Sequence, residues 1–87
     1  MRLELEKAFR KRAKQLLKKN PLLKKAYEEV LLKLSINPFD PTLHTHSLSG
    51  ELKGKYACSL TYDLRITFMV SDDTVHLLDI GTHDEVY

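Results

Sequence analysis

The spacing of apolar residues changes once along this chain, and the change divides it into a helical half and a strand half. Up to about residue 35, apolar side chains recur every three or four positions, which is the period of a helix with one buried stripe. From Tyr56 to Ile80 they alternate with polar ones, which is the period of strands with one buried face. Separate helical and strand halves predict an α+β fold, in which helices cover one face of a sheet.

The helical half predicts two helices that pack as an antiparallel hairpin. The first covers about residues 5–17. Asn20-Pro21 then breaks the pattern, because Asn favours the position before a helix and Pro the first position inside one. The second helix runs to about Ser35, and so short a link returns it alongside the first. Charged and apolar residues alternate over 2–5, which favours a short first strand.

The strand half predicts three consecutive strands. They cover residues 56–62, 64–70 and 74–80, and Gly81 ends the last of them. Links this short favour an antiparallel meander. The predicted order is therefore βααβββ, with residues 1–87 as one domain and a helix hairpin packed on one face of a small antiparallel sheet.

Alternation along the strands assigns their side chains to two faces of the sheet. The face under the helices should bury Leu60, Ile66 and Phe68. The other face then carries small polar residues around one arginine: Ser59, Thr61, Arg65 and Thr67. A guanidinium on such a face reaches a phosphate with two parallel hydrogen bonds. The alternative is a surface arginine paired with Asp63 or Asp79.

Composition and charge exclude several classes of protein. No apolar run is long enough for a transmembrane helix, and the charged first residues do not form a secretory signal. Cys58 is the only cysteine, so an internal disulfide is excluded and a reducing cytoplasm is expected. Residues 1–37 carry a net charge of +7 and residues 38–87 a net charge of −5. The basic half either binds a polyanion or an acidic protein, or is a solvated helix surface.

Histidines are further candidates for chemistry, because imidazole exchanges protons near neutral pH. His44 and His46 lie in the predicted loop before the strands, and His83 lies near the C-terminus. His76 alternates with apolar residues, which indicates a structural role. We expect neither a metal site at the two loop histidines nor any cofactor, because the spacing matches no zinc motif and no second cysteine is present. Cys58 shares a strand face with core residues and should be an inert thiol.

Three segments of the second half form a specific succession. They read H-S-L-S-G-E-L-K-G over 46–54, Y-D-L-R-I over 62–66 and I-G-T-H-D-E-V-Y over 80–87. Together they resemble the RelE/ParE superfamily of type II toxin–antitoxin toxins, especially its YafQ-like branch. The resemblance spans about half of the chain and implies the same βααβββ, RelE-like fold.

The resemblance also implies an activity, that of a ribosome-dependent mRNA endoribonuclease that inhibits translation. In such toxins a nucleotide's 2′-OH attacks the adjacent phosphate and displaces the 5′-oxygen, so RNA is the substrate. The protein must accept one proton, stabilise the anionic phosphorane and donate another proton. By this resemblance Arg65 would stabilise the phosphorane, and His83 and His46 would transfer protons. Asp63 matches an acidic position, and Tyr87 matches a terminal aromatic residue that orients a base.

The expected partners follow from the same resemblance. Lys53 and Lys55 would hold the RNA backbone, while Lys11 and Lys14 on the first helix would contact ribosomal RNA. A cognate antitoxin would bind the basic half through an acidic segment. Operator DNA would be contacted only through that antitoxin, and no membrane partner is expected.

Three residues depart from the family pattern. Ser59 stands where the YafQ-like branch has a histidine, Leu64 replaces a tryptophan and Asp79 replaces an arginine. The departures leave the assignment of acid and base open, and an acid beside the phosphate site helps only if it orients His83 or Arg65. Two alternatives also stay open: a catalytically weakened protein that serves as an antitoxin-binding co-repressor, and a ParE-like gyrase inhibitor with the same fold. The histidines and the terminal segment favour the ribonuclease branch.

Overall fold

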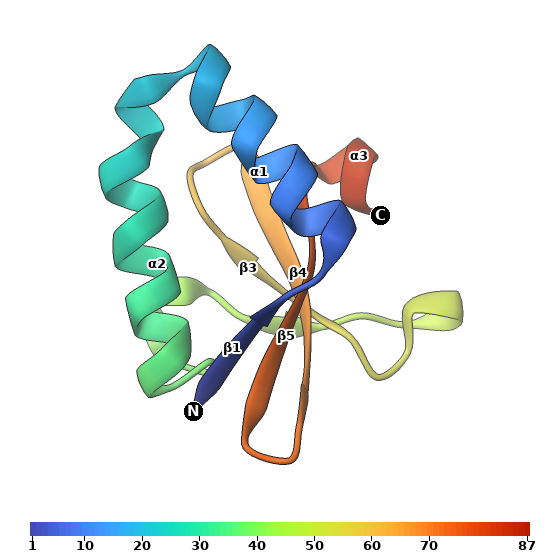
Figure 1. The fold of residues 1–87 in the computed structure, drawn as a ribbon. Helices are drawn as coiled ribbons and strands as arrows, with labels where there is room; N and C mark the ends of the chain where they lie inside the picture. The colour runs from blue at the N-terminus through green and yellow to red at the C-terminus, as the bar shows by residue number, and fades with distance from the viewer.

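The helical half of the chain forms a hairpin of two helices (Figure 1). In the computed structural model, which describes residues 1–87, α1 spans Lys7–Lys19 and α2 spans Lys24–Ile36, with the 3-10 turn Pro21–Leu23 between them. The prediction that Asn20 caps the second helix is wrong, because its side chain makes no capping hydrogen bond. Its backbone N–H instead donates to a carbonyl in the last turn of α1 and closes that helix. All helices are too short or too polar to span a bilayer.

Five strands form one sheet in the order β1-β5-β4-β3-β2. The three longer strands of the second half make the predicted antiparallel meander. The first strand pairs in parallel with β5, so the α+β prediction is confirmed but the sheet is mixed rather than antiparallel throughout. Short links predict the meander, whereas this parallel partner lies some seventy residues away. The strands are β1 (Arg2–Leu5), β2 (His46–Ser47), β3 (Tyr56–Ser59), β4 (Leu64–Ser71) and β5 (Thr74–Thr82).

The strand ends differ from the predicted ones. The strand predicted over 56–62 ends at Ser59, because the backbone N–H of Leu60 turns to donate to the carbonyl of Leu64 at 2.9 Å. The last strand does not end at Gly81 but continues to Thr82, because β4 still pairs with it there. The segment predicted as a loop contains the two-residue β2 at the edge of the sheet.

The core lies between the helix hairpin and the sheet. Phe9 of α1 and Leu34 of α2 are fully buried against the strands. The predicted burial of Leu60, Ile66 and Phe68 is confirmed. Seven further buried residues complete this core: Ala13, Val30, Leu43, Cys58, Val75, Leu77 and Ile80.

One residue assigned to the open face is buried. Thr67 is only 4% exposed, because it lies on the central strand between Ala57 of β3 and Asp79 of β5. A β-bulge follows it: Thr67 pairs with Asp79, but Phe68 pairs with Leu77. Strict alternation is therefore a poor guide at this point of β4, although Arg65 stays half-exposed as predicted.

Candidate active site

A short helical turn at the C-terminus continues directly from β5 (Figure 1). This turn, α3, spans His83–Val86 and begins with a capping box. The Thr82 backbone N–H donates to Glu85 Oε1 at 2.8 Å, and hydrogen bonds from the Thr82 backbone and side chain lower the pKa of the Glu85 carboxyl. The Tyr87 backbone N–H donates to the His83 carbonyl at 3.1 Å. The turn thus places His83 and Tyr87 together at the end of the sheet.

Tyr87 lies between two of the predicted histidines. Its ring meets that of His83 edge-on with the centroids 4.2 Å apart, and its hydroxyl lies 3.3 Å from His46 Nε2. On the other side of the His46 ring, Nδ1 lies 3.3 Å from the carbonyl oxygen of His44. A carbonyl only accepts, so this contact favours the tautomer of the neutral ring in which Nδ1 carries the proton and Nε2 accepts the Tyr87 hydroxyl. The contact leaves His46 with a basic nitrogen directed at the C-terminal turn.

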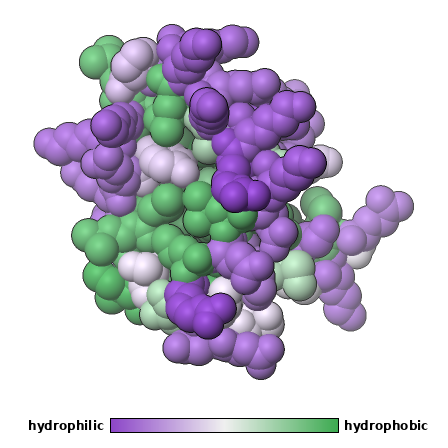
Figure 2. All heavy atoms as spheres, viewed as in Figure 1, coloured by the Kyte–Doolittle hydropathy of each residue, from purple (hydrophilic) through white to green (hydrophobic).

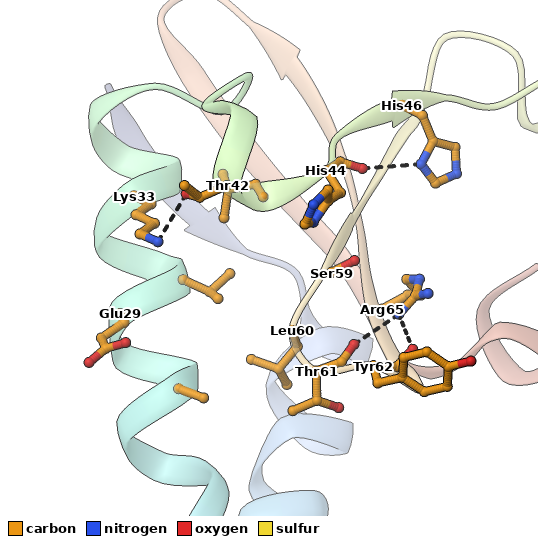
Figure 3. A pocket seen from close by; sticks show the side chains of 13 residues that line it. Glu29, Lys33, Thr42, His44, His46, Ser59, Leu60, Thr61, Tyr62 and Arg65 are labelled. Carbon is orange, nitrogen blue, oxygen red and sulfur yellow. Dashed lines mark hydrogen bonds between the residues drawn. The ribbon is translucent and has the colours of Figure 1, made fainter.

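Arg65 is fixed in place by carbonyl groups. Its Nη1 donates to the carbonyls of Thr61 and Tyr62 at 2.9 Å each (Figure 3). It also donates to the carbonyl of Leu64 at 3.1 Å. The turn after β3 supplies the first two acceptors, and the first residue of β4 supplies the third. No carboxylate pairs with the guanidinium, and Nη2 and Nε make no hydrogen bond within the protein. One edge of the guanidinium therefore orients it, while the other keeps its donors and its charge for a ligand.

The charge of Arg65 reaches the hydroxyl of Tyr87. Partial burial raises the pKa of Tyr87, and the positive charge of Arg65 opposes that shift. On the sheet, Arg65 lies between Ser59 of β3 and Gly81 of β5. Gly81 immediately precedes Thr82, the cap of α3. The structure thus brings Arg65, His46, His83 and Tyr87 to one end of the sheet.

A hollow of about 640 Å³ opens beside this cluster, between α2 and the strands (Figure 3). Arg65, His46 and Ser59 line one side of it. Lys33 of α2 lies on the opposite side, where its Nζ donates to Thr42 Oγ1 at 2.9 Å. The hollow extends the reactive end of the sheet into a space with a mixed polar and apolar lining.

The remaining predicted site residues lie around this cluster rather than in it. Asp63 accepts a hydrogen bond from Thr61 Oγ1 at 3.0 Å within the turn that holds Arg65, without contacting the guanidinium. Lys53 and Lys55 follow the 3-10 turn that precedes β3, and the first is exposed while the second is half-buried. Lys11 and Lys14 are exposed on α1, over which hydrophilic side chains gather in Figure 2.

Two hypotheses about Asp79 are wrong. It neither pairs with Arg65 nor contacts His83, because its Oδ1 lies 3.2 Å from Nε of Arg12 on α1. The same oxygen accepts the Ile80 backbone N–H at 2.8 Å. Of the other departures, Ser59 is the direct β3 neighbour of Arg65, and Leu64 packs against the core.

Sequence reasoning missed the ion pairs made by Arg12. Its Nη1 lies 3.5 Å from Glu85 Oε2, so one guanidinium joins α1, β5 and α3. Arg12 is one of the basic residues between the apolar positions of the first helix, and Glu85 belongs to the terminal motif; no spacing rule connects positions this far apart. The only signal was the acid at position 79, whose partner the sequence does not reveal.

Metal-ligating side chains gather at a different place. Only Glu4, Glu6 and His76 bring three such groups together, at the β1–β5 pair. There His76 Nδ1 lies 3.8 Å from a carboxylate oxygen of each glutamate, and its Nε2 lies 3.0 Å from Ser71 Oγ, so its ring faces neighbouring side chains of the sheet, as a structural role requires. Cys58 is fully buried, and burial raises its pKa to about 12, so the thiol is inert as predicted.

Comparison with known proteins places the chain among bacterial toxins. Residues 1–87 match the family of the bacterial toxin of type II toxin–antitoxin systems, YafQ. Among solved structures, a copper-bound mutant toxin from Helicobacter pylori is 32% identical with a TM-score of 0.87, covering 100% of this chain and 99% of the other. YafQ from Escherichia coli is 20% identical with a TM-score of 0.84, over 100% and 99% of the two chains.

A third structure shares the fold at lower identity. The YoeB toxin in the YoeB–YefM complex from Staphylococcus aureus is 17% identical with a TM-score of 0.80, over 95% of this chain and 97% of the other. No curated protein sequence matches the chain significantly. The family match also covers the helical half, which lies outside the three sequence motifs. The structural neighbours have the same α+β fold as this chain. The chain belongs to the YafQ family of bacterial type II toxin–antitoxin toxins.

Proposed function

We propose that this toxin is a ribosome-dependent mRNA endoribonuclease that acts in the cytoplasm. The observation that carries the proposal is the cluster of His46, Tyr87 and His83 beside an arginine that no acid neutralises. The cluster combines groups that exchange protons near neutral pH with a fixed cation. Those are the groups that cleavage of RNA by its own 2′-OH needs.

In the proposed reaction His46 Nε2 takes the proton of the 2′-OH, and the resulting oxygen attacks the adjacent phosphorus. The bond from phosphorus to the 5′-oxygen breaks, and His83 gives that oxygen a proton. The products are a 2′,3′-cyclic phosphate and a 5′-hydroxyl, so no water or metal ion is consumed. His46 suits the base because its Nδ1 proton is held by the His44 carbonyl, which leaves Nε2 as an acceptor.

Arg65 and Tyr87 stabilise and orient the reacting group in this scheme. The free Nη2 and Nε of Arg65 donate to the phosphorane oxygens, while Nη1 stays on its three carbonyls. The Tyr87 ring offers a surface for a nucleotide base, and its hydroxyl gives up the single lone pair of His46 Nε2 to the 2′-OH when RNA binds. Asp63 orders the turn that supplies the carbonyls.

Basic residues outside the cluster would hold the RNA and the ribosome. Lys53 and Lys55 precede β3, and Lys11 and Lys14 lie on the cationic surface of α1. Phosphate contacts release counterions, so binding to ribosomes should weaken steeply as salt is added. A binding affinity independent of salt would refute this role.

The expected partner in the cell is a cognate antitoxin. The neighbour from Staphylococcus aureus is a complex of the YoeB toxin with YefM, which supports a partner of the same class here. The exposed apolar residues Leu32 and Ile36 lie one turn apart on α2, and the surrounding hairpin is basic. An antitoxin segment with apolar and acidic side chains would complement both features, and operator DNA would be reached through it.

Cleavage of mRNA on purified ribosomes tests the activity. Purified toxin should produce new 5′ ends at defined codon positions, and Arg65→Ala, His46→Gln or His83→Gln should reduce the rate by at least a hundredfold. His76→Gln is the matched control, because this histidine lies near the other end of β5. Intact mRNA with wild-type toxin would reject the enzyme in favour of a co-repressor, and gyrase inhibition without RNA cleavage would identify a ParE-like poison.

A further inference from the structure

We infer that Arg12 is a positioning residue that holds the C-terminal turn, and with it His83 and Tyr87, against the body of the toxin. The inference rests on the proposed ribonuclease function for its effect on rate. Its structural part stands on two ion pairs made by one guanidinium. No family motif considered above includes Arg12.

The guanidinium of Arg12 joins three elements. Its Nε lies 3.2 Å from Asp79 Oδ1 on β5, and its Nη1 lies 3.5 Å from Glu85 Oε2 on α3. Asp79 is itself oriented, because the same oxygen accepts the Ile80 backbone N–H at 2.8 Å. Glu85 uses its other oxygen, Oε1, for the Thr82 backbone N–H at 2.8 Å. Each acid therefore binds the backbone of its own element and the side chain of α1.

The turn lies against β4 and β5, but its side chains make few other contacts. It comprises four residues, none of which is buried. Besides the capping box, its side chains contact only their neighbours Asp84 and Tyr87 through His83, and Arg12 through Glu85. A single helical turn has no stability of its own, because nucleation costs more than one turn of hydrogen bonds returns. The side chain of His83 is 71% exposed, so packing does not fix it either. The direction of the turn consequently depends on Glu85 and on what holds Glu85.

Gly81 shows how closely these groups meet. A methyl group at this position would lie 2.9 Å from Glu85 Oε1 and 3.2 Å from Nη1 of Arg12. Gly81 is buried in β5 and directly neighbours Arg65 on β4. The Arg12–Glu85 contact thus passes over the backbone of Gly81, which lies beside Arg65. It therefore sets the position of the C-terminal turn α3 relative to Arg65.

Four substitutions separate positioning from folding and from charge. Arg12→Ala removes both ion pairs, and Arg10→Ala removes the same charge from an exposed site on the same helix. Glu85→Gln keeps an oxygen for the Thr82 cap but loses the charge that faces Arg12. Arg12→Lys restores the charge, so it should recover part of any loss. Thermal melting of each variant identifies those that fail to fold.

Two readouts are measured on each folded variant. The first is the nuclear Overhauser contact between the rings of His46 and Tyr87, which needs no activity. The second is the single-turnover rate of mRNA cleavage with saturating ribosomes, together with the dissociation constant for ribosomes. Arg12→Ala should weaken the ring contact and lower the rate about tenfold to a hundredfold, because a displacement near 1 Å has effects of that size. Its dissociation constant should match that of Arg10→Ala, and Glu85→Gln should show a smaller loss of the same kind.

The outcomes are distinguishable from failure of the proposed function. If wild-type toxin does not cleave mRNA, the ring contact still tests the positioning role. A folded Arg12→Ala protein with an unchanged ring contact would overturn the inference. A loss of rate that Arg10→Ala reproduces would also overturn it, because the cause would then be the charge of α1. If Arg12→Ala does not fold, the ring contact in Glu85→Gln decides: a wild-type contact there overturns the inference.

Discussion

Replacing Gly81 by alanine should destabilise the toxin, although Gly81 has no positive φ and lies inside a strand. In a strand an alanine is normally more favourable than a glycine by about 0.5–1 kcal/mol, because glycine loses more conformational freedom on folding. Here the new methyl group would lie 2.9 Å from Glu85 Oε1 and 3.1 Å from Glu85 Cβ, whereas an ordinary contact begins near 3.4 Å. Glu85 would have to move by about 0.5 Å, and the capping box resists that movement.

The expected magnitude follows from these opposing effects. Inserting a methyl group into a close-packed contact costs about 1–3 kcal/mol, so the net loss should be about 0.5–2 kcal/mol after the backbone gain. Urea unfolding followed by circular dichroism measures it. In a Glu85→Ala background the oxygen at 2.9 Å from the methyl group is gone but the Cβ atom at 3.1 Å remains, so the same Gly81→Ala change should cost less than in the wild type. Equal effects of Gly81→Ala in the two backgrounds, within about 0.5 kcal/mol, would refute the reasoning.

Three further predictions concern the core and the titrating groups. Phe9→Ala should cost about 3–5 kcal/mol in urea unfolding, because Phe9 is fully buried, and a cost below about 1 kcal/mol would show that the site collapses around the gap. Burial raises the Cys58 pKa from 9.0 to about 12, so the stability due to its neutral thiol is complete below pH 9 and is lost as the pH rises toward 12. Cys58→Ala should therefore have a flatter decline of stability above pH 9 than the wild type, and parallel declines would count against a buried thiol. Hydrogen bonds from the Thr42 side chain and backbone lower the Asp40 pKa below 3.8, so the stability they provide is present at neutral pH and is lost in acid. Thermal melting from pH 7 to pH 2 should therefore show a smaller loss of stability in acid for Asp40→Asn than for the wild type.

The fold was predictable wherever local sequence determines it. Phe9 and Ala13 recur at helical spacing and are buried, and Ile66 and Phe68 alternate on one face of β4 and are buried. Burial of Thr67 was not predictable by alternation, because it depends on neighbours in two other strands. The parallel partner of β1 was also hidden, since a four-residue edge strand pairs as well with one edge as with another until the tertiary structure selects.

The candidate site was predictable only in its residue types. Motif resemblance named His46, His83, Tyr87 and Arg65, and these four residues do lie at one end of the sheet. The sequence did not show that backbone carbonyls rather than an acid hold Arg65, because carbonyl positions depend on how the turn after β3 closes. Contacts between α1 and the last residues were equally invisible, since they join segments that meet only after the sheet has formed.

The parallel pairing of β1 with β5 also makes the first strand the last to find its place. Residues 2–5 are synthesised before the helices and the first strands of the meander, whereas their partners over 74–77 follow only after these elements. β1 stays unpaired while the helices and the meander are synthesised, because contacts between residues far apart in the sequence form slowly and late. The sheet can therefore close only after residues 74–77 have been synthesised, which delays the first folded form of the toxin until that point.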